Sequence, residues 1–461
     1  MYQYAKALWF DHSLRMNPPI RWGEYEHVVP QWSIGLSLAY APLLAVLSNT
    51  IFSADTSIRK IPDPSITNYS HRLLYDPHYQ YCSLLNPVIT ALSAAVLYLL
   101  CLQLGLSNKK AGAAALTFGL FSPATVYSKL DFAQPLVTLF ILLAFLFLLK
   151  AEATRRGFDR SMAGICLGLA VLSRSEFMII APLLVLSVYF IPARVSSTAT
   201  NNPIDTLKNL LWFALPLCAI VLVNQGINFL KFGSWLSTGY PLAYYLTFDL
   251  KHWSTAFAGN LISPGRGVLL FFPLSILSIT GFRKLVTIDR WFATTLLIFL
   301  CWEFIFYPIW RTWDGGISWG PRYLIPVMPY LSLLAYVALP PVMAIWRRFI
   351  VVLLLAFGAI GALQGLLFGF EFYGSLGLTS AQLEQQLYHF SFPMSPLFAG
   401  WKGLLQPASY DIKWVHLDPG TKIGLLWPFT AVLCLALLTR FWFNFFRASD
   451  IDAIVCDVIQ H

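Results

Sequence analysis

The chain has 461 residues, of which 57% are hydrophobic and only 11% are charged. Soluble domains carry about 25% charged residues, so this composition excludes a water-soluble enzyme. The formal net charge is +9, but no run of Lys and Arg is long enough for a nucleic-acid-binding patch, which excludes nucleic acid as a partner. In a membrane protein, such an excess of Lys and Arg is first of all a signal of topology.

Apolar stretches that approach the roughly 20 residues of a membrane-spanning helix recur along the chain. A further apolar segment, 162–191, is interrupted by the polar sequence Ser173-Arg174-Ser175-Glu176, which leaves two short pieces. The expected spanning helices are 84–104, 111–127, 133–149, 210–230, 267–282, 291–309, 323–346, 349–370 and 423–443, with two short ones from 162–191.

Clusters of Lys and Arg lie in alternate loops between these stretches. All of the clusters share one face only if 162–191 crosses the membrane twice, with the break near Arg174 and Glu176. Because Lys and Arg are enriched on the cytoplasmic side, this arrangement is the favoured one. The opposite, non-cytoplasmic face then receives most of the polar side chains suited to chemistry, in the loops 53–83, 128–132, 231–266, 310–322 and 371–422.

The segment before residue 84 allows two interpretations. Either 34–52 crosses the membrane, or it lies in the outer interface and 1–83 form one external loop. We favour the second, which predicts an apolar helix upstream of Met1. The expected organisation is an external loop (1–83, with an interfacial helix near 34–52), a transmembrane core (84–370), an external subdomain (371–422), a last membrane helix (423–446) and a cytoplasmic tail (447–461).

The segment 310–323, WRTWDGGISWGPRY, is the strongest local pattern. Its three glycines allow positive φ angles or close backbone approach. Arg311 and Arg322 are fixed cations suited to phosphate, and Trp313, Asp314 and Trp319 are expected to line a pocket. The alternative is an ordinary interfacial turn with Trp anchors and Arg side chains that reach the headgroups. A second turn, 260–267, places Arg266 on the same face as a further phosphate contact.

Carboxylates on this face are candidates for a general base that activates an acceptor. No histidine shows metal-ligand spacing, so no cofactor is predicted firmly, although a carboxylate could hold a divalent metal. Glu176 and Glu303 fall within apolar stretches, where a paired Arg or a function is the usual explanation for an acid. The candidate catalytic residues are Glu26, Asp131, Asp11 and Glu24.

Seven segments are similar to those of a known family: PQWSIGLSLAYAPLL (30–44), NPVITALSAAVLYLLCLQL (86–104), YSKLDFAQPL (127–136), GLAVLSRSE (168–176), KFGSWLSTGY (231–240), SPGRGVLLFFP (263–273) and WDGGISWGPRYLIPVMP (313–329). Together they resemble the GT-C superfamily of membrane glycosyltransferases, which use polyprenyl-phosphate sugars. Within it they are similar to the bacterial relatives of protein O-mannosyltransferases and of the lipid A aminoarabinose transferase. The resemblance covers roughly residues 1–345, and the last two segments are specific in combination.

The resemblance implies an all-α polytopic bundle of about 11 membrane helices with a large first external loop. It also implies inverting hexosyl or pentosyl transfer to a lipid, glycan or protein acceptor, outside the plasma (inner) membrane, as part of cell-envelope glycosylation. In the family a catalytic Asp follows the first helix, and here that Asp would lie before Met1. Gln134 stands where relatives often have an acid. By the same resemblance, Arg266 and Arg322 would hold the lipid phosphate, and Asp314 would line that pocket.

Two alternatives remain. A lipid or solute transporter often contains internal repeats and a site at the bilayer midplane. We find no repeat, and the polar groups gather on one face. The other alternative is a non-catalytic GT-C relative.

Overall fold

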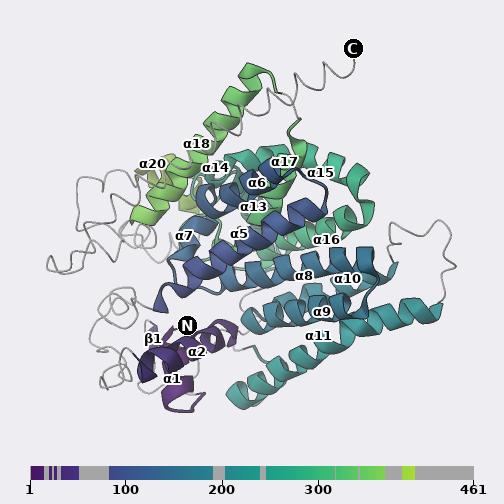
Figure 1. Cartoon of the computed structure of the whole chain (residues 1–461). Coiled ribbons are helices and arrows are strands. Elements are labelled where there is room, and N and C mark those ends of the chain that lie inside the picture. The colour runs from purple at the N-terminus through teal and green to yellow at the C-terminus, as the bar shows by residue number, and fades with distance from the viewer. Residues whose placement is uncertain are drawn as a thin grey trace.

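The computed structural model describes residues 2–14, 20–22, 25–27, 33–50, 82–190, 203–238, 246–316, 318–340, 343–368 and 387–399. Apart from one short hairpin, the regular structure in these ranges is helical (Figure 1). The hairpin joins β1 (Ile20–Trp22) to β2 (Tyr25–His27) in antiparallel register. An all-α fold was expected, so this hairpin in the N-terminal segment is a small addition to it.

The first half of the chain supplies a row of long helices. The α-helices of this half are α1 (Tyr2–Phe10), α2 (Gly35–Asn49), α5 (Leu85–Gln103), α6 (Asn108–Phe121), α7 (Ala124–Ser128), α8 (Gln134–Thr154), α9 (Gly157–Ser173), α10 (Phe177–Phe190) and α11 (Pro203–Phe232). In Figure 1, α5, α8, α9 and α11 lie side by side, from the middle of the view to its lower edge. Each of these helices contacts the next one in that row.

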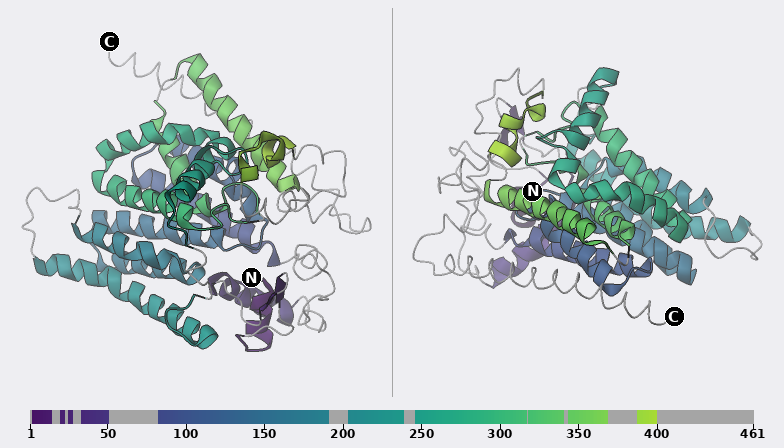
Figure 2. Two further views of the ribbon diagram at one scale, coloured as in Figure 1. Left: turned by 180° about the vertical axis from the view of Figure 1, so that it is seen from behind. Right: turned by 90° about the horizontal axis from the view of Figure 1, so that it is seen from above.

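The second half packs against α6, α8 and α10 of the first half. Its elements are α13 (Leu250–Ile262), α14 (Val268–Phe271), η2 (Pro273–Leu277), α15 (Ser278–Ile288), α16 (Arg290–Phe306), η3 (Tyr307–Ile309), η4 (Arg322–Val327), α17 (Met328–Ala338), α18 (Ile345–Phe368), η7 (Leu387–Phe390), η8 (Phe392–Met394) and α20 (Pro396–Ala399). Helix α17 packs against α15 and α6. Seen from behind in Figure 2, α18 runs obliquely over this half, away from α11.

Close helix contacts depend on small residues, as is usual in membrane bundles. A Cβ added to Gly164 of α9 would lie 2.1 Å from the carbonyl oxygen of Phe213 in α11. A Cβ on Gly281 of α15 would lie 1.8 Å from the carbonyl oxygen of Leu334 in α17. Neither contact leaves room for a larger side chain, so these two glycines set the spacing of their helix pairs.

Five described helices are long and apolar enough to cross a membrane, which makes the chain a multi-pass membrane protein. They are Leu85–Gln103, Gln134–Thr154, Ile204–Phe232, Arg290–Ile309 and Ile345–Leu367, and shorter apolar helices cover Gly35–Asn49, Phe177–Leu186 and Arg322–Ala338. The expected break in 162–191 is present between α9 and α10. The total of about 11 membrane helices remains a prediction, and the expected helix 423–443 and tail 447–461 lie outside the described residues.

Two expected spanning helices are shorter and more broken than the sequence suggested. The stretch 267–282 divides into α14, η2 and the start of α15, because Pro273 has no N–H to donate and Phe272 is not helical (φ −143°, ψ 71°). The stretch 323–346 begins as the 3₁₀ helix η4 with Pro326 inside it, and α17 ends at Ala338, just before two consecutive prolines. The hydrophobic pattern located both segments but not their breaks.

Candidate functional site

The buried side chain of Arg266 donates hydrogen bonds to the loop 310–322. The turn after α13 places this side chain in the interior, where it is 0% exposed. Its Nη1 donates to the carbonyl and the hydroxyl of Ser318 and to the carbonyl of Gly320, the last at 2.9 Å, and its Nη2 donates to the carbonyl of Gly316 at 2.6 Å. The N–H groups of Gly265 and Arg266 donate within the chain as well, to His389 and Ser263. The side-chain donors on both Nη atoms of Arg266 therefore fix the loop, and the backbone donors of this turn are used elsewhere in the protein.

The loop needs left-handed backbone conformations, as its glycines indicated. Gly315 and Gly316 have φ angles of +76° and +68°, and Gly320 has +60°. Residues with a Cβ rarely adopt these conformations. The two carbonyl groups of Gly316 and Gly320 that accept from Arg266 thus lie at positions where the chain reverses.

The two tryptophans expected to line a pocket are almost completely buried. Trp313 is 2% exposed and packs over Gly259 of α13, where an added Cβ would lie 2.1 Å from the indole ring. Trp319 is 0% exposed, and its indole N–H donates to Gln364 at 3.0 Å. The Trp319 carbonyl accepts from the hydroxyl of Tyr127 at 2.8 Å. Both rings therefore anchor the loop to the surrounding helices.

Asp314 forms a buried pair with His389, which comes from the segment 387–399. The carboxylate accepts from His389 Nε2 at 2.9 Å and from the Gly316 N–H at 3.0 Å. Burial raises the pKa of Asp314, but the His389 hydrogen bond and the Arg266 cation outweigh it and lower the pKa to about 2. Burial, followed by the Arg266 cation, lowers the pKa of His389 to about 4 against the effect of Asp314. A neutral histidine thus donates to an ionised aspartate at pH 7.

Sequence reasoning did not single out His389. It lies in the segment 371–422, whose composition gave no reason to choose one side chain. Only the fold brings it against the ring of Trp313, with 5.6 Å between the ring centroids.

A second polar cluster forms where three separated segments meet. Gln134 is the first residue of α8, Arg174 lies in the break between α9 and α10, and Arg322 begins η4. A guanidinium group only donates, so the Gln134 amide presents its oxygen to both arginines. In that orientation the oxygen accepts from Arg174 Nη1 at 2.7 Å and from Arg322 Nε at 3.0 Å.

Aromatic rings and two acids, Glu176 and the buried Glu303, surround Arg174. Its guanidinium pairs with Glu176 and lies 5.2 Å from the ring centroid of Tyr323 and 5.9 Å from that of Tyr307. These two rings are stacked, with centroids 4.6 Å apart. The paired Arg expected for Glu176 from the sequence is therefore Arg174. The N–H of Ser175 in this break donates to Ser33 Oγ at 3.0 Å.

Arg322 has a different set of neighbours. Its guanidinium lies 4.0 Å from the ring centroid of Phe132, and its Nη1 donates to the Gly315 carbonyl at 3.0 Å. It is half-buried, whereas Arg266 is fully enclosed. Arg311, the third predicted phosphate contact, is also half-buried, at the start of the loop, and is not part of this cluster.

The four candidate acids lie in different places. Asp11 is exposed just after α1, and Glu26 belongs to β2, opposite Arg21 in the ladder. Glu24 lies outside the described residues. Asp131 is half-buried in the turn that leads into α8.

The turn that carries Asp131 is fixed to α5. The Asn86 side chain donates to the carbonyls of Leu130 and Phe132, at 2.5 and 3.1 Å. Phe132 stacks on Arg322, and Gln134 follows two residues later. Of the candidate acids in the described residues, Asp131 is thus the one whose own turn contributes side chains to the arginine cluster.

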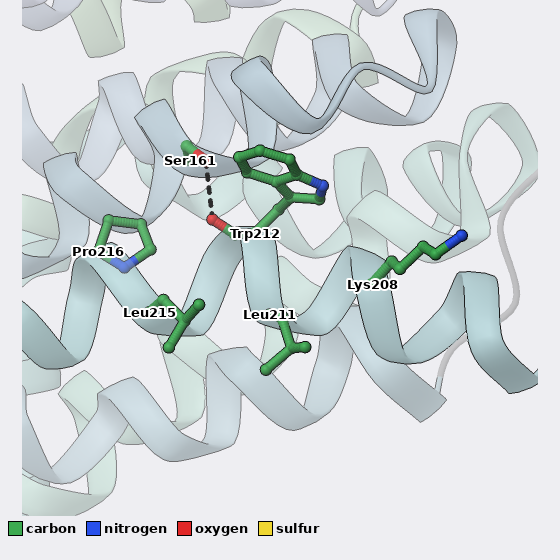
Figure 3. Close-up of a pocket in the computed structure, with 6 residues that line it drawn as sticks. All are labelled: Ser161, Lys208, Leu211, Trp212, Leu215 and Pro216. Carbon is green, nitrogen blue, oxygen red and sulfur yellow. Dashed lines mark hydrogen bonds between the residues drawn. The ribbon is translucent and has the colours of Figure 1, made fainter.

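Within the described residues, no group of three or more His, Cys, Asp or Glu side chains could hold a metal ion. A pocket of about 320 Å³ lies elsewhere, between α9 and α11 (Figure 3). Its residues include none of the candidates: they are Ser161, Lys208, Leu211, Trp212, Leu215 and Pro216. Ser161 Oγ donates to the Trp212 carbonyl at its edge, at 3.0 Å.

No protein-family model matches the chain, and no curated protein matches its sequence. Solved structures of the Archaeoglobus fulgidus oligosaccharyltransferase are similar to it. The AglB complex with an inhibitory peptide and a dolichol-phosphate has 16% identity and a TM-score of 0.45, over 86% of this chain and 55% of that one. The apo form has 14% identity and a TM-score of 0.44, over 86% of this chain and 56% of that one. The chain spans about half the length of these structures, and the similarity is too low to assign a family or an activity.

Proposed function

We propose that the chain is a membrane glycosyltransferase that moves a sugar from a polyprenyl-phosphate carrier to a lipid, glycan or protein acceptor, on the non-cytoplasmic side of the plasma membrane. One observation carries the proposal. Arg322, in the segment whose sequence resembles the GT-C superfamily, is a half-buried cation at the point where three segments converge. A fixed guanidinium in such a setting is suited to a phosphate group.

The chemistry needs a stabilised leaving group and an activated acceptor. The acceptor oxygen or nitrogen forms a bond to the anomeric carbon, and the bond between that carbon and the phosphate oxygen breaks. The electron pair stays on the phosphate, so the departing carrier gains a negative charge. Cations held in place before the reaction stabilise this charge.

The proton of the acceptor requires a base, and we assign that role to Asp131. The Asn86 contacts fix its turn, and the same turn supplies Phe132 to the Arg322 side chain. The carboxylate of Asp131 would take the acceptor proton as the new bond forms. Glu24, Glu26 and Asp11 are the alternatives, each at a position that the sequence places before α2.

The proposal assigns Arg266, Asp314, Trp313 and Trp319 to the shape of the loop. The donors on both Nη atoms of Arg266 point to loop groups, and both tryptophans are buried against helices. Their contribution to phosphate binding would then be indirect, through the position of Arg322.

The test uses the full-length natural protein in lipid nanodiscs with polyprenyl-phosphate sugars extracted from its host membranes. Mass spectrometry measures the conversion of sugar-linked carrier to free polyprenyl phosphate. We expect conversion by the wild type, a loss of about 100-fold or more for Asp131→Asn, and a similar loss for Arg322→Ala. Lys251→Ala, an exposed cation on α13, should keep the wild-type rate. If the wild type binds the carrier and releases no sugar, the chain is a non-catalytic relative; if it also moves intact carrier between leaflets, it is a transporter.

A further inference from the structure

Two positive side chains share a single neutral acceptor in the second cluster. The amide oxygen of Gln134 lies 2.7 Å from Arg174 Nη1 and 3.0 Å from Arg322 Nε. The two guanidinium groups are therefore separated only by the oxygen atom to which both donate. Like charges at this separation repel, and an amide dipole offsets that repulsion less than an anion does.

The available negative charge lies on one side of the pair. Glu176 forms an ion pair with Arg174, and its side chain is 16% exposed. Among the described residues, no carboxylate lies within ion-pair distance of Arg322. The buried Glu303 also interacts electrostatically with Arg174, beyond ion-pair distance. The two guanidinium groups therefore have one directly paired carboxylate between them, in a setting lined by aromatic rings.

The surroundings fix the two cations. Phe132 lies against Arg322, and the stacked rings of Tyr307 and Tyr323 lie against Arg174. Ring contacts hold a guanidinium plane in place but leave its N–H edges able to donate. Gln134 also stands at the N-terminus of the 21-residue helix α8, whose dipole favours an anion at that end.

We infer that Arg174 and Gln134 complete, with Arg322, a two-arginine site for the phosphate of the lipid carrier. This inference rests on the proposed function and adds the second cation and the residue that spaces the pair. Gln134 holds the guanidinium groups at a separation that one phosphate can bridge, and the non-bridging oxygens accept from both. Glu176 orients Arg174 and competes with the phosphate for it.

The site predicts opposite effects for two isosteric changes. Gln134→Glu places a carboxylate between the arginines, so it should weaken phosphate binding by roughly tenfold or more. Glu176→Gln removes the competing charge, so it should strengthen binding, by about threefold or more. If the cluster had only a structural role, both changes would lower the stability of the protein. They would not shift the affinity for phosphate in opposite directions.

The experiment measures the affinity of the full-length protein in nanodiscs for farnesyl phosphate, with farnesol as the probe that lacks the phosphate. We expect Arg174→Ala and Arg322→Ala each to lower the affinity for farnesyl phosphate by about tenfold or more, and to leave farnesol unchanged. Arg283→Ala, an exposed arginine on α15, is the matched control and should bind like the wild type. If Arg174→Ala leaves Glu176 unpaired and the protein unfolds, the double variant Arg174→Gln/Glu176→Gln replaces it.

The outcomes separate this inference from the proposed function. Sugar release that depends on Arg322, together with unchanged farnesyl phosphate affinity in Arg174→Ala and Gln134→Glu, would overturn the two-arginine site and leave the glycosyltransferase proposal standing. Phosphate binding that depends on Arg174 and Gln134, without any sugar release, would keep the site and overturn the enzyme. Equal binding of farnesol and farnesyl phosphate by the wild type would overturn the site.

Discussion

Arg266 and the pair Arg174–Arg322 show two uses of the same side chain within one bundle. Arg266 is 0% exposed and gives its Nη donors to Gly316, Ser318 and Gly320. Arg174 and Arg322 lie against aromatic rings and share a neutral amide oxygen. In the first arrangement the chain's own carbonyls accept from the guanidinium, and in the second two guanidinium groups share one neutral acceptor and one directly paired carboxylate.

The difference shows that residue type and face do not define a ligand contact. From the sequence, Arg322 was predicted to contact a phosphate and Arg266 to provide a second contact. In the fold, carbonyl acceptors surround Arg266, whereas Arg322 shares the amide oxygen of Gln134 with Arg174. A guanidinium that donates to several carbonyls maintains a loop, whereas two guanidinium groups that share one neutral acceptor are suited to an anion.

Arg266→Ala should give the largest loss of stability. It leaves the buried carbonyls of Gly316, Ser318 and Gly320 without their donor, which costs about 3 kcal/mol or more. The apparent melting temperature in detergent measures the effect. Lys251→Ala, on the exposed face of α13, should stay within about 0.5 kcal/mol of the wild type. A stable Arg266→Ala protein that has lost farnesyl phosphate binding would reverse the comparison.

Gly259→Ala tests whether Trp313 anchors the loop 310–322, to which Arg266 donates. The new methyl group would lie 2.1 Å from the indole ring, so the ring must move, at about 1–3 kcal/mol. Thermal unfolding in detergent is again the measurement. Gly226→Ala on α11 is the control, because its methyl group would meet Trp235 only at 3.8 Å. If both alanine variants unfold at the wild-type temperature, the loop is not anchored through Trp313.

Low pH should lower the stability of the protein through protonation of His389 in the unfolded chain. Its pKa is about 4 in the fold against 6.5 in the unfolded chain, so between these values only the unfolded chain takes up the proton. Stability should therefore fall as the pH drops through this window, by about 2 kcal/mol at pH 5. Asp314, with a pKa lowered from 3.8 to about 2, adds its own loss only below about pH 4.

Melting curves between pH 7 and pH 4 check this expectation. His389→Gln keeps a donor for Asp314 and should flatten the dependence between pH 6.5 and 4. His12→Gln, at an exposed position, should retain it. Identical profiles for His389→Gln and the wild type would exclude His389 as the source.

Arg311→Ala should have the smallest effect. The side chain is half-buried at the start of the loop, outside the cluster of Arg174 and Arg322. Screening limits what a cation can add without direct contact, so farnesyl phosphate affinity should change by less than about threefold. A loss as large as that of Arg322→Ala would make Arg311 part of the site and sharpen the assignment to three arginines.

The hydrophobic pattern of the sequence predicted much of the fold. Long apolar runs predicted α5, α8, α11, α16 and α18 because a spanning helix must be apolar along most of its length. The polar break at 173–176 predicted two helices, and the structure contains α9 and α10 there. The breaks at Pro273 and before α17 were missed, since composition alone does not tell whether a proline starts a helix or divides it.

The candidate site was predictable in part. The glycines of the loop 310–322 predicted its left-handed turns, and Glu176 predicted an arginine partner. His389 could not be found, because the sequence places it far from Asp314 and gives it no motif. The role of Gln134 was hidden for the same reason: its two donors come from segments 40 and 188 residues away along the chain.

By itself, the sequence determined that this chain is a helical membrane protein, because helix length and apolar composition are local properties. Only the tertiary structure decided which arginine is enclosed by carbonyls and which two arginines meet. That choice depends on the distances between side chains of separate helices, and these distances are set by packing, such as the contact of Gly164 with α11 and of Gly281 with α17.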